Sequence, residues 1–197
     1  STVTALCLAT LASRAGDKVH HYGLDSAGRE RVSGGRGGKI IETLARTFTG
    51  ISPRLEGTAW SGMVSAGEQT VRHSAFVVIA TKIPPAGMET EFTDALARLR
   101  DRHPVLVASA TDPDEIRARA GREDAEQVFL AASASLAERS DEAGATDARL
   151  AGALTVRAPA GPLPARHADR YIQPKKSRRL RAAPPSPPPC RPVGQQP

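Results

Sequence analysis

Apolar side chains recur along this 197-residue chain with two different periods. Spacings of three and four residues predict amphipathic helices over residues 3–15, 40–48, 60–72, 88–102 and 123–143. Continuous apolar runs predict buried strands at 75–81 and 104–110, a third strand is expected at 152–159, and residues 17–33 have the pattern of a β-hairpin. Because strands and helices alternate after the hairpin, the pattern favours an α/β fold with a largely parallel sheet and helices on both faces.

Several residues with special backbone chemistry mark the expected ends of these elements. Asp112 is suited to cap a helix, because its side chain accepts a hydrogen bond from a free backbone N–H, and Pro113 suits the first turn. We expect Gly144 to end the helix that begins near residue 123, and residues 25–28 to form the hairpin turn. A last short helix is expected over residues 163–173.

The positive charge of the chain is concentrated at its C-terminal end. The net charge is +6, yet six of the 27 basic residues and none of the 21 acidic residues lie from Lys175 onward, so residues 1–174 carry no net charge. Residues 182–197 contain seven prolines, and such a composition does not bury enough apolar surface to fold. We therefore expect one domain over residues 1–174 and a basic, Pro-rich disordered tail over residues 175–197.

The distribution of charge also bears on the kind of partner. A nucleic-acid-binding domain normally carries its basic excess on the folded part, so we expect no specific nucleic-acid partner. The tail offers non-specific contacts with anionic lipid or nucleic acid. No apolar run approaches the roughly 18 residues that a membrane span requires, so we expect this chain to be soluble.

The ends of the chain and its cysteines suggest a location. Cys7 and Cys190 lie far apart and are too few for a disulfide framework or a metal site, which suits a reducing, cytoplasmic compartment. Ser1 is not a methionine, and the residues after it lack the pattern of a signal peptide, so we expect the chain to begin inside a larger protein.

The Gly-rich segment SGGRGGK at residues 33–39 is similar to a phosphate-binding loop. Such a loop needs a glycine five residues before its last glycine, and Ser or Thr after the lysine. Here Ser33 and Ile40 occupy these positions, and the segment follows a hairpin strand. A flexible turn before a helix is therefore the favoured interpretation, and a nucleotide-binding or hydrolase domain that uses this loop is the alternative.

No arrangement of polar residues in the sequence predicts a catalytic site. The nucleophile elbow Gly-x-Ser-x-Gly does not occur. His20 and His21 are adjacent on an expected strand, so their side chains point to opposite faces and cannot share a metal. Acidic pairs such as Glu89 with Glu91 suit helix starts. We therefore expect a non-enzymatic protein without a cofactor.

Four short motifs follow one another in an order and spacing that resemble a known bacterial family. They are Gly16-Asp17-Lys18-Val19, Arg102-His103-Pro104-Val105, Asp112-Pro113, and Asp169-Arg170-Tyr171 with Lys175. Together they resemble the C-terminal two-thirds of the bacterial domain-of-unknown-function family fifty-eight, which is von Willebrand factor A-like. The resemblance implies a three-layer, mostly parallel α/β sheet with one antiparallel hairpin, whose first, central strand would precede Ser1.

In this fold the carboxyl edge of the sheet carries a metal-ion-dependent adhesion site. The resemblance implies oxygen ligands from an Asp-x-Ser-x-Ser loop after the first strand, a threonine of a second loop, and an aspartate after the strand that corresponds to residues 75–81. In this chain the first loop would precede Ser1, Thr58 is the candidate threonine, and Lys82 follows Thr81 in place of the aspartate. The site is therefore expected to be degenerate and to bind no metal.

The resemblance also implies a function in protein–protein interaction. Family members often carry membrane helices and are encoded beside MoxR-type AAA+ ATPases, which suggests a role in the assembly of protein complexes. The partner-binding candidates are Thr58, Trp60, Thr81 and Lys82. A lysine has three donors and no acceptor, so Lys82 cannot be a metal ligand. Simple loss of the site, with Lys82 in solvent, is the favoured interpretation. The alternative is that the charge of Lys82 stands near the place of the cation and attracts a partner's carboxylate.

Overall fold

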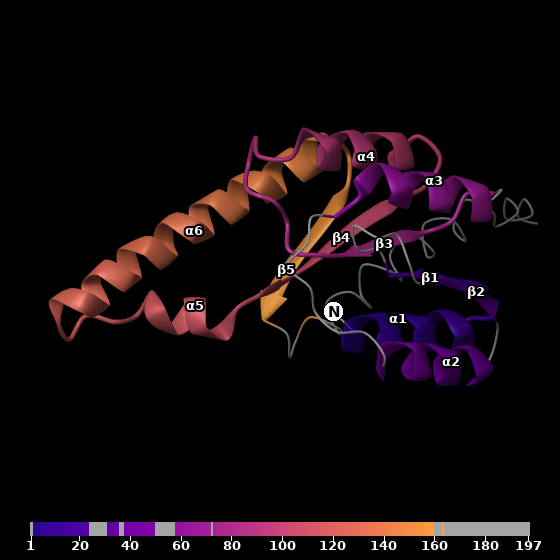
Figure 1. Ribbon diagram of the computed structural model, residues 1–197, viewed down its shortest axis with the longest axis horizontal. Helices are drawn as coiled ribbons and strands as arrows, with labels where there is room; N and C mark the ends of the chain where they lie inside the picture. Colours follow the sequence, from indigo (N-terminus) through magenta and orange to yellow (C-terminus); the bar gives the residue numbers. More distant parts are fainter. Residues whose placement is uncertain are drawn as a thin grey trace, which may run out of the picture.

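The computed structural model describes residues 2–23, 31–35, 38–49, 58–71, 73–159 and 163 (Figure 1). The N-terminal elements are α1 (Thr2–Arg14), β1 (Val19–Tyr22), β2 (Arg31–Gly35), α2 (Gly38–Thr49) and α3 (Trp60–Thr70). They are followed by β3 (Val77–Ala80), α4 (Thr90–Arg100), β4 (Val105–Thr111), α5 (Pro113–Ala118), α6 (Ala125–Leu150) and β5 (Leu154–Pro159). The expected helix at 163–173, except Leu163, and the expected domain boundary at residue 174 lie outside the described residues.

Strands β3, β4 and β5 form a parallel sheet in that order. The register pairs Val77 of β3 with Val105 of β4, and Leu106 of β4 with Leu154 of β5. The first five residues of β4 are all buried, because this central strand is covered on both faces. The parallel sheet predicted from the alternation of strands and helices is therefore confirmed.

Helices α3, α4 and α6 lie on one side of this sheet (Figure 1). Because the parallel strands follow one another in a single direction, crossovers of the same hand place α4 and α6 on the same face. The core on this side consists of Trp60, Val64, Ile79, Ile83, Phe92, Ala95, Leu96, Leu99, Val105, Val107, Ala145, Ala148 and Ala153. The contribution of α6 to this core is made by alanines, so the helix can approach its neighbours closely.

A second core lies on the opposite face of the sheet. It contains Leu106, Val156, Ala158 and Leu163. Helices α1 and α2 lie on this side of the molecule in Figure 1, and they have a small core of their own around Ala9, Ile40 and Leu44. The arrangement is an open α/β fold that is compatible with three layers.

The antiparallel hairpin differs from the predicted single sheet. Within the described residues, β1 pairs with β2 and β3 pairs with β4, so the hairpin and the parallel sheet share no strand. Strands join one ladder only when they lie about 4.8 Å apart. Here the Tyr22 hydroxyl donates to Thr70 Oγ1, so a side-chain contact attaches the hairpin to the end of α3. The expectation that the hairpin belongs to the main sheet was therefore wrong for the described residues.

Helix α6 also differs from its prediction, because it continues through Gly144 to Leu150. A Cβ atom at Gly144 would overlap the carbonyl oxygen of Pro84 and would lie 3.3 Å from Ile83 Cγ2. Gly144 is therefore a point of close packing inside the helix. The helix ends at Leu150, and Gly152 terminates it: this glycine has a φ of 89° and donates its N–H to the Arg149 carbonyl, the geometry of a C-terminal glycine cap.

His103 connects the beginning of β3 to the beginning of β4. It is 4% exposed, and its Nδ1 accepts a hydrogen bond of 3.2 Å from the backbone N–H of Ala75. This bond requires the neutral imidazole, because a protonated Nδ1 has no lone pair to accept. Burial and the nearby charge of Arg102 lower the pKa of His103, whereas the charge of Glu68 acts in the opposite direction.

We expect Gly144→Ala to lower the free energy of unfolding by about 1–3 kcal/mol, because the new methyl group must displace the loop at Pro84. Gly62→Ala is the matched control, since its Cβ would meet only Ala59 Cβ at 3.8 Å on the exposed side of α3. The control should be neutral or stabilise by up to about 1 kcal/mol. Urea unfolding followed by circular dichroism measures both, and equal effects would contradict the close packing at Gly144.

The stability of the chain should decrease as the pH falls below about 6.5, because the unfolded state binds a proton on His103 more readily than the folded state does. The loss continues down to the lowered pKa of the folded state and has a slope of at most about 1.4 kcal/mol per pH unit for one histidine. His103→Asn offers an acceptor that does not titrate and should reduce this slope. Part of the slope should remain, because burial also lowers the pKa of His21.

Candidate functional site

The carboxyl edge of the parallel sheet is the first place to look for a binding site, because ligands of open α/β sheets bind beyond the carboxyl ends of the strands. Thr81 and Lys82 follow directly after β3, and Asp112 lies between β4 and α5. Asp112 accepts a 2.8 Å hydrogen bond from the Asp114 N–H, so the predicted helix cap is confirmed.

The backbone on both sides of Lys82 is held in place. The N–H of Thr81 donates to the Ala108 carbonyl at 3.0 Å, which extends the pairing of β3 with β4. The N–H of Ile83 donates to Ser109 Oγ at 3.4 Å, and the Ile83 side chain is 1% exposed. Since its neighbours are fixed to the sheet and the core, Lys82 is presented to solvent with 65% of its side chain exposed.

Lys82 has a partner within the chain. Its Nζ lies 3.4 Å from Glu115 Oε1, and the Glu115 side chain is 35% exposed. Nearby, Asp114 and Arg117 form a second exposed ion pair on α5. The carboxyl edge is therefore a polar surface of mixed charge, in which the Lys82 ammonium already contacts one carboxylate.

The other two residues predicted to bind a partner lie at the start of α3. Trp60 is 4% exposed, its ring centroid is 4.7 Å from that of Phe92, and its Nε1 donates to Glu89 Oε2 at 2.7 Å. The indole of Trp60 is therefore part of the core and offers almost no surface to a partner. Thr58 is half-buried, and its carbonyl accepts from the Trp60 N–H at 3.0 Å.

The Gly-rich segment 33–39 is only partly described. Its first residues belong to β2, its last two begin α2, and residues 36 and 37 lie outside the described residues. A Cβ at Gly35 would lie 2.9 Å from Ile40 Cβ, so the packing of α2 against β2 accounts for this glycine. The Lys39 side chain is exposed.

Within the described ranges, no three His, Cys, Asp or Glu side chains are grouped so as to hold a metal ion. The same part of the chain contains no helix with the length and apolarity of a membrane span. An open, polar depression is lined by Glu68 of α3, Arg98 of α4, and Asp101 and Arg102. The last two residues lie just before the amino end of β4, so the depression is not at the carboxyl edge that carries Lys82.

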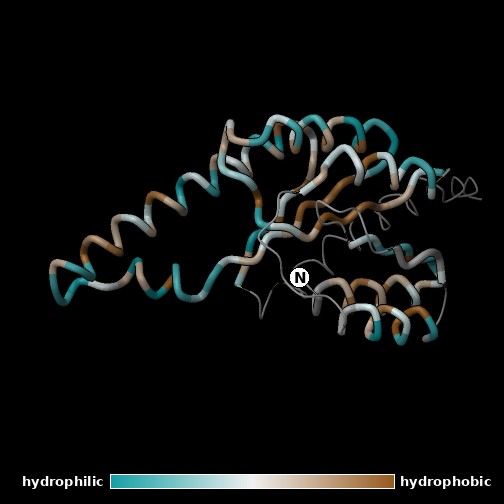
Figure 2. Tube along the Cα trace, in the orientation of Figure 1, coloured by the Kyte–Doolittle hydropathy of each residue, from teal (hydrophilic) through white to brown (hydrophobic). Residues whose placement is uncertain are grey.

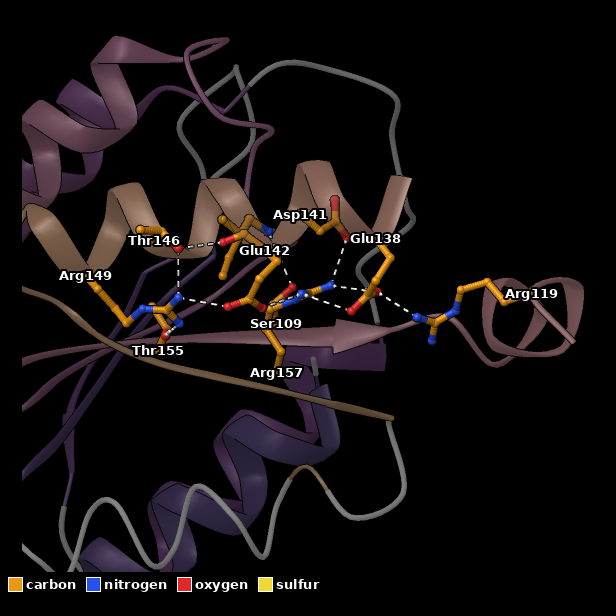
Figure 3. A network of polar contacts seen from close by, with 10 residues as sticks. Ser109, Arg119, Glu138, Asp141, Glu142, Thr146, Arg149, Thr155 and Arg157 are labelled. Carbon is orange, nitrogen blue, oxygen red and sulfur yellow. Dashed lines mark hydrogen bonds and ion pairs between the residues drawn. The ribbon is translucent and has the colours of Figure 1, made fainter. Parts of the chain in front are cut away.

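A network of ion pairs joins α6 to β5 close to the carboxyl edge (Figure 3). Arg157 of β5 is central, with 10% of its side chain exposed. Its guanidinium lies 3.2 Å from Glu138 Oε2, 3.3 Å from Asp141 Oδ2 and 3.1 Å from Glu142 Oε2. Three carboxylates of one helix therefore converge on a single buried cation of the sheet.

An outer set of charges surrounds this centre (Figure 3). Arg149 lies 2.8 Å from Glu142 and donates to Thr155 Oγ1 at 3.2 Å, and Arg119 lies 3.7 Å from Glu138. The hydrogen bond from Arg149 is the main cause that lowers the pKa of Glu142, and the bond from Arg157 adds to it. Because three cations face three carboxylates, the network is balanced and serves to hold α6 and α5 on the sheet.

The sequence interpretation missed this network, although two signals were present. Arg157 stands at an inward position of a strand that otherwise reads as buried, next to Val156 and Ala158. Glu138, Asp141 and Glu142 have the spacing i, i+3, i+4, which places them on one face of a helix. An arginine that points into the protein needs acidic partners, and a helix with three acidic residues on one face offers them. Together the two signals predict an ion-pair network between this strand and this helix.

Comparison with protein-family models, with curated proteins and with solved structures finds no match to this chain.

We expect Arg157→Ala to lower the free energy of unfolding by about 3–5 kcal/mol, because Asp141 would remain as a buried carboxylate without its cation. Arg149→Ala removes an arginine of the same network whose side chain is 46% exposed, and it should cost less than about 1 kcal/mol. Urea unfolding of the two variants measures the difference. If both variants lose the same free energy of unfolding, the low exposure of Arg157 does not make its ion pairs more important for stability than those of Arg149.

Proposed function

We propose that this chain is a non-enzymatic protein-interaction domain of the von Willebrand factor A-like type, and that it binds a carboxylate of its partner at the carboxyl edge of the parallel sheet. The observation that supports this proposal is the ion pair between Lys82 and Glu115. The ammonium of Lys82 is exposed on a loop whose backbone is anchored to the sheet, at the edge where open α/β sheets bind their ligands.

The geometry of this pair makes it exchangeable. An ion pair with a separation of 3.4 Å and a lysine exposed by 65% contributes little to stability, because water screens both charges. A carboxylate of a partner can therefore replace Glu115 at small cost and gain a shorter, better desolvated contact. Glu115 then acts as an internal competitor for the partner.

This arrangement also fits the proposed loss of metal binding. Thr58 is the one oxygen ligand left from the metal site that the family resemblance implies, and the ammonium of Lys82 repels a divalent cation rather than binding it. We propose that the fixed charge of Lys82 takes the place of the cation in attracting a partner. The interaction would then be independent of Mg²⁺.

The family resemblance suggests a MoxR-type AAA+ ATPase as the partner, in a role in the assembly of protein complexes. A purified MoxR-type ATPase from the same genome is therefore the first partner to test. Binding through an exposed ammonium should weaken as the salt concentration rises, because ions screen the attraction.

We expect Lys82→Ala to weaken binding to this ATPase by about tenfold or more, since a partner's charged group loses its counterpart. Glu115→Gln should have the opposite effect and strengthen binding a few-fold, because it removes the competing carboxylate without changing the shape of the side chain. Lys39→Ala, an exposed lysine on α2, is the control for net charge and should leave binding unchanged. Biolayer interferometry at two salt concentrations measures all four proteins.

Two results would count against the proposed function. Binding that is the same in the wild type, Lys82→Ala and Glu115→Gln would show that the carboxyl edge is not the binding surface. A rise in melting temperature with ATP and Mg²⁺ would favour the alternative, in which residues 33–39 bind a nucleotide, because a ligand of the native state stabilises it.

A further inference from the structure

Helix α6 has a continuous row of exposed residues along its whole length. The row consists of Ala125, Phe129, Ala132, Leu136, Arg139, Ala143, Thr146 and Leu150, each of which is exposed, and we call it the seam. The spacings alternate between four and three residues, which is the pattern of positions a and d in a coiled coil. Within the seam Phe129 is 73% exposed, Leu136 66% and Leu150 81%, which is unusual for large apolar side chains in one row.

The helix is also longer than the sheet that it covers. Its 26 residues span about 39 Å, whereas the six residues of β5 span about 20 Å. Figure 1 shows the N-terminal half of α6, together with α5, extending away from the sheet, and Figure 2 shows that apolar stretches recur on this half. Because a helix is stabilised mainly by packing an apolar face, a projecting helix with an exposed seam is suited to a partner helix.

We propose that the seam binds the seam of a second copy of this chain, with the two α6 helices antiparallel. In an antiparallel pair each a residue faces a d residue of the other helix, and the seam then matches itself over its full length. The four layers, each formed twice, are Phe129 with Thr146, Leu136 with Arg139, Ala143 with Ala132, and Leu150 with Ala125. Large side chains thus lie opposite smaller or flexible ones.

A parallel pair of the same helices is less favourable. It would place each seam residue against its own copy, so that Arg139 would face Arg139 in one layer and alanine would face alanine in three others. The antiparallel pair sets the arginine against Leu136, along which its aliphatic stem can lie while its charged end reaches water. It also aligns the two helix dipoles head to tail, which is the favourable orientation.

The expected dimer is weak. A contact strip about 39 Å long and about 10 Å wide covers on the order of 400 Å² of each helix, or about 800 Å² in total, which belongs to the class of transient interfaces. The antiparallel register also places Glu126 close to Asp147 of the second copy, and these like charges weaken the contact further. We therefore expect a dimer that forms reversibly with increasing concentration and strengthens when salt screens this repulsion.

The seam proposal does not rest on the proposed function. The seam is on the face of α6 that points away from the buried Ala145 and Ala148, and it includes neither Lys82 nor Glu115. Self-association and binding of a partner's carboxylate can therefore fail or succeed separately.

Sedimentation velocity over a concentration series of the full chain tests the proposal. The wild type should show a reversible increase in mass toward a dimer, and Phe129→Glu with Leu136→Glu should raise the dimer dissociation constant by at least about tenfold, because charges replace the largest seam residues. Leu130→Glu is the matched control, since Leu130 is 50% exposed on the same half of the helix but lies outside the seam. Circular dichroism establishes that all variants remain folded.

Disulfide cross-linking tests the orientation of the two helices. In a Cys7→Ser, Cys190→Ser background, chains with Ala132→Cys should cross-link to chains with Ala143→Cys when the two are mixed, because these positions share a layer only in the antiparallel pair. Each variant alone should remain uncross-linked. Cross-linking of each variant to itself would show a parallel pair and overturn the proposal.

Two further outcomes would also overturn it. A wild type that stays monomeric over the series excludes self-association, and in that case a lower melting temperature of Leu136→Glu would show that a segment of the same chain covers the seam. A dimer that persists in the double glutamate variant would place the interface elsewhere on the molecule.

Discussion

The close contact between α6 and the loop after β3 is the constraint on which the rest of the structure depends. Gly144 lets the helix lie directly against the Pro84 carbonyl, and Ala145 and Ala148 continue the same small-residue surface into the core. A larger side chain at any of these positions would move the helix away from the loop. Because Lys82 lies on this loop and the seam lies on this helix, both proposed binding surfaces are positioned by one packing contact.

The charged network around Arg157 supplements this contact in a different way. Small residues allow a close approach, but they leave a helix able to slide or rotate on a smooth surface. An arginine that is 10% exposed and meets three carboxylates at one place removes that freedom, because a displacement would separate it from Asp141, which is 13% exposed, and leave both charges with little access to water. Such a network adds less net stability than its number of ion pairs suggests, so we attribute to it the orientation of α6 rather than the stability of the fold.

Local sequence rules predicted the individual helices and strands better than the contacts between them. The apolar run before Lys82 and the cap at Asp112 were recognised correctly because each depends on a few adjacent residues. Gly144 was taken for a helix end because glycine favours that position in general, whereas the glycine that terminates α6 after Leu150 is Gly152, where φ is positive. Only the tertiary neighbour Pro84 explains the first glycine. The separation of the hairpin from the parallel sheet and the burial of Trp60 likewise depend on contacts between distant residues.

The same distinction between local sequence signals and tertiary contacts applies to the two proposed binding surfaces, at Lys82 and on α6. The sequence placed Lys82 at a strand end, and the structure adds Glu115, which turns an isolated charge into one member of an exchangeable pair. In α6, three faces have three compositions: small residues toward the core, acidic residues toward Arg157, and the exposed seam on the remaining side. A helix that needed only to cover the sheet would be polar on its third face and shorter by about half. The proposed contact between two copies of the chain accounts both for the large apolar residues on this third face and for the extra length.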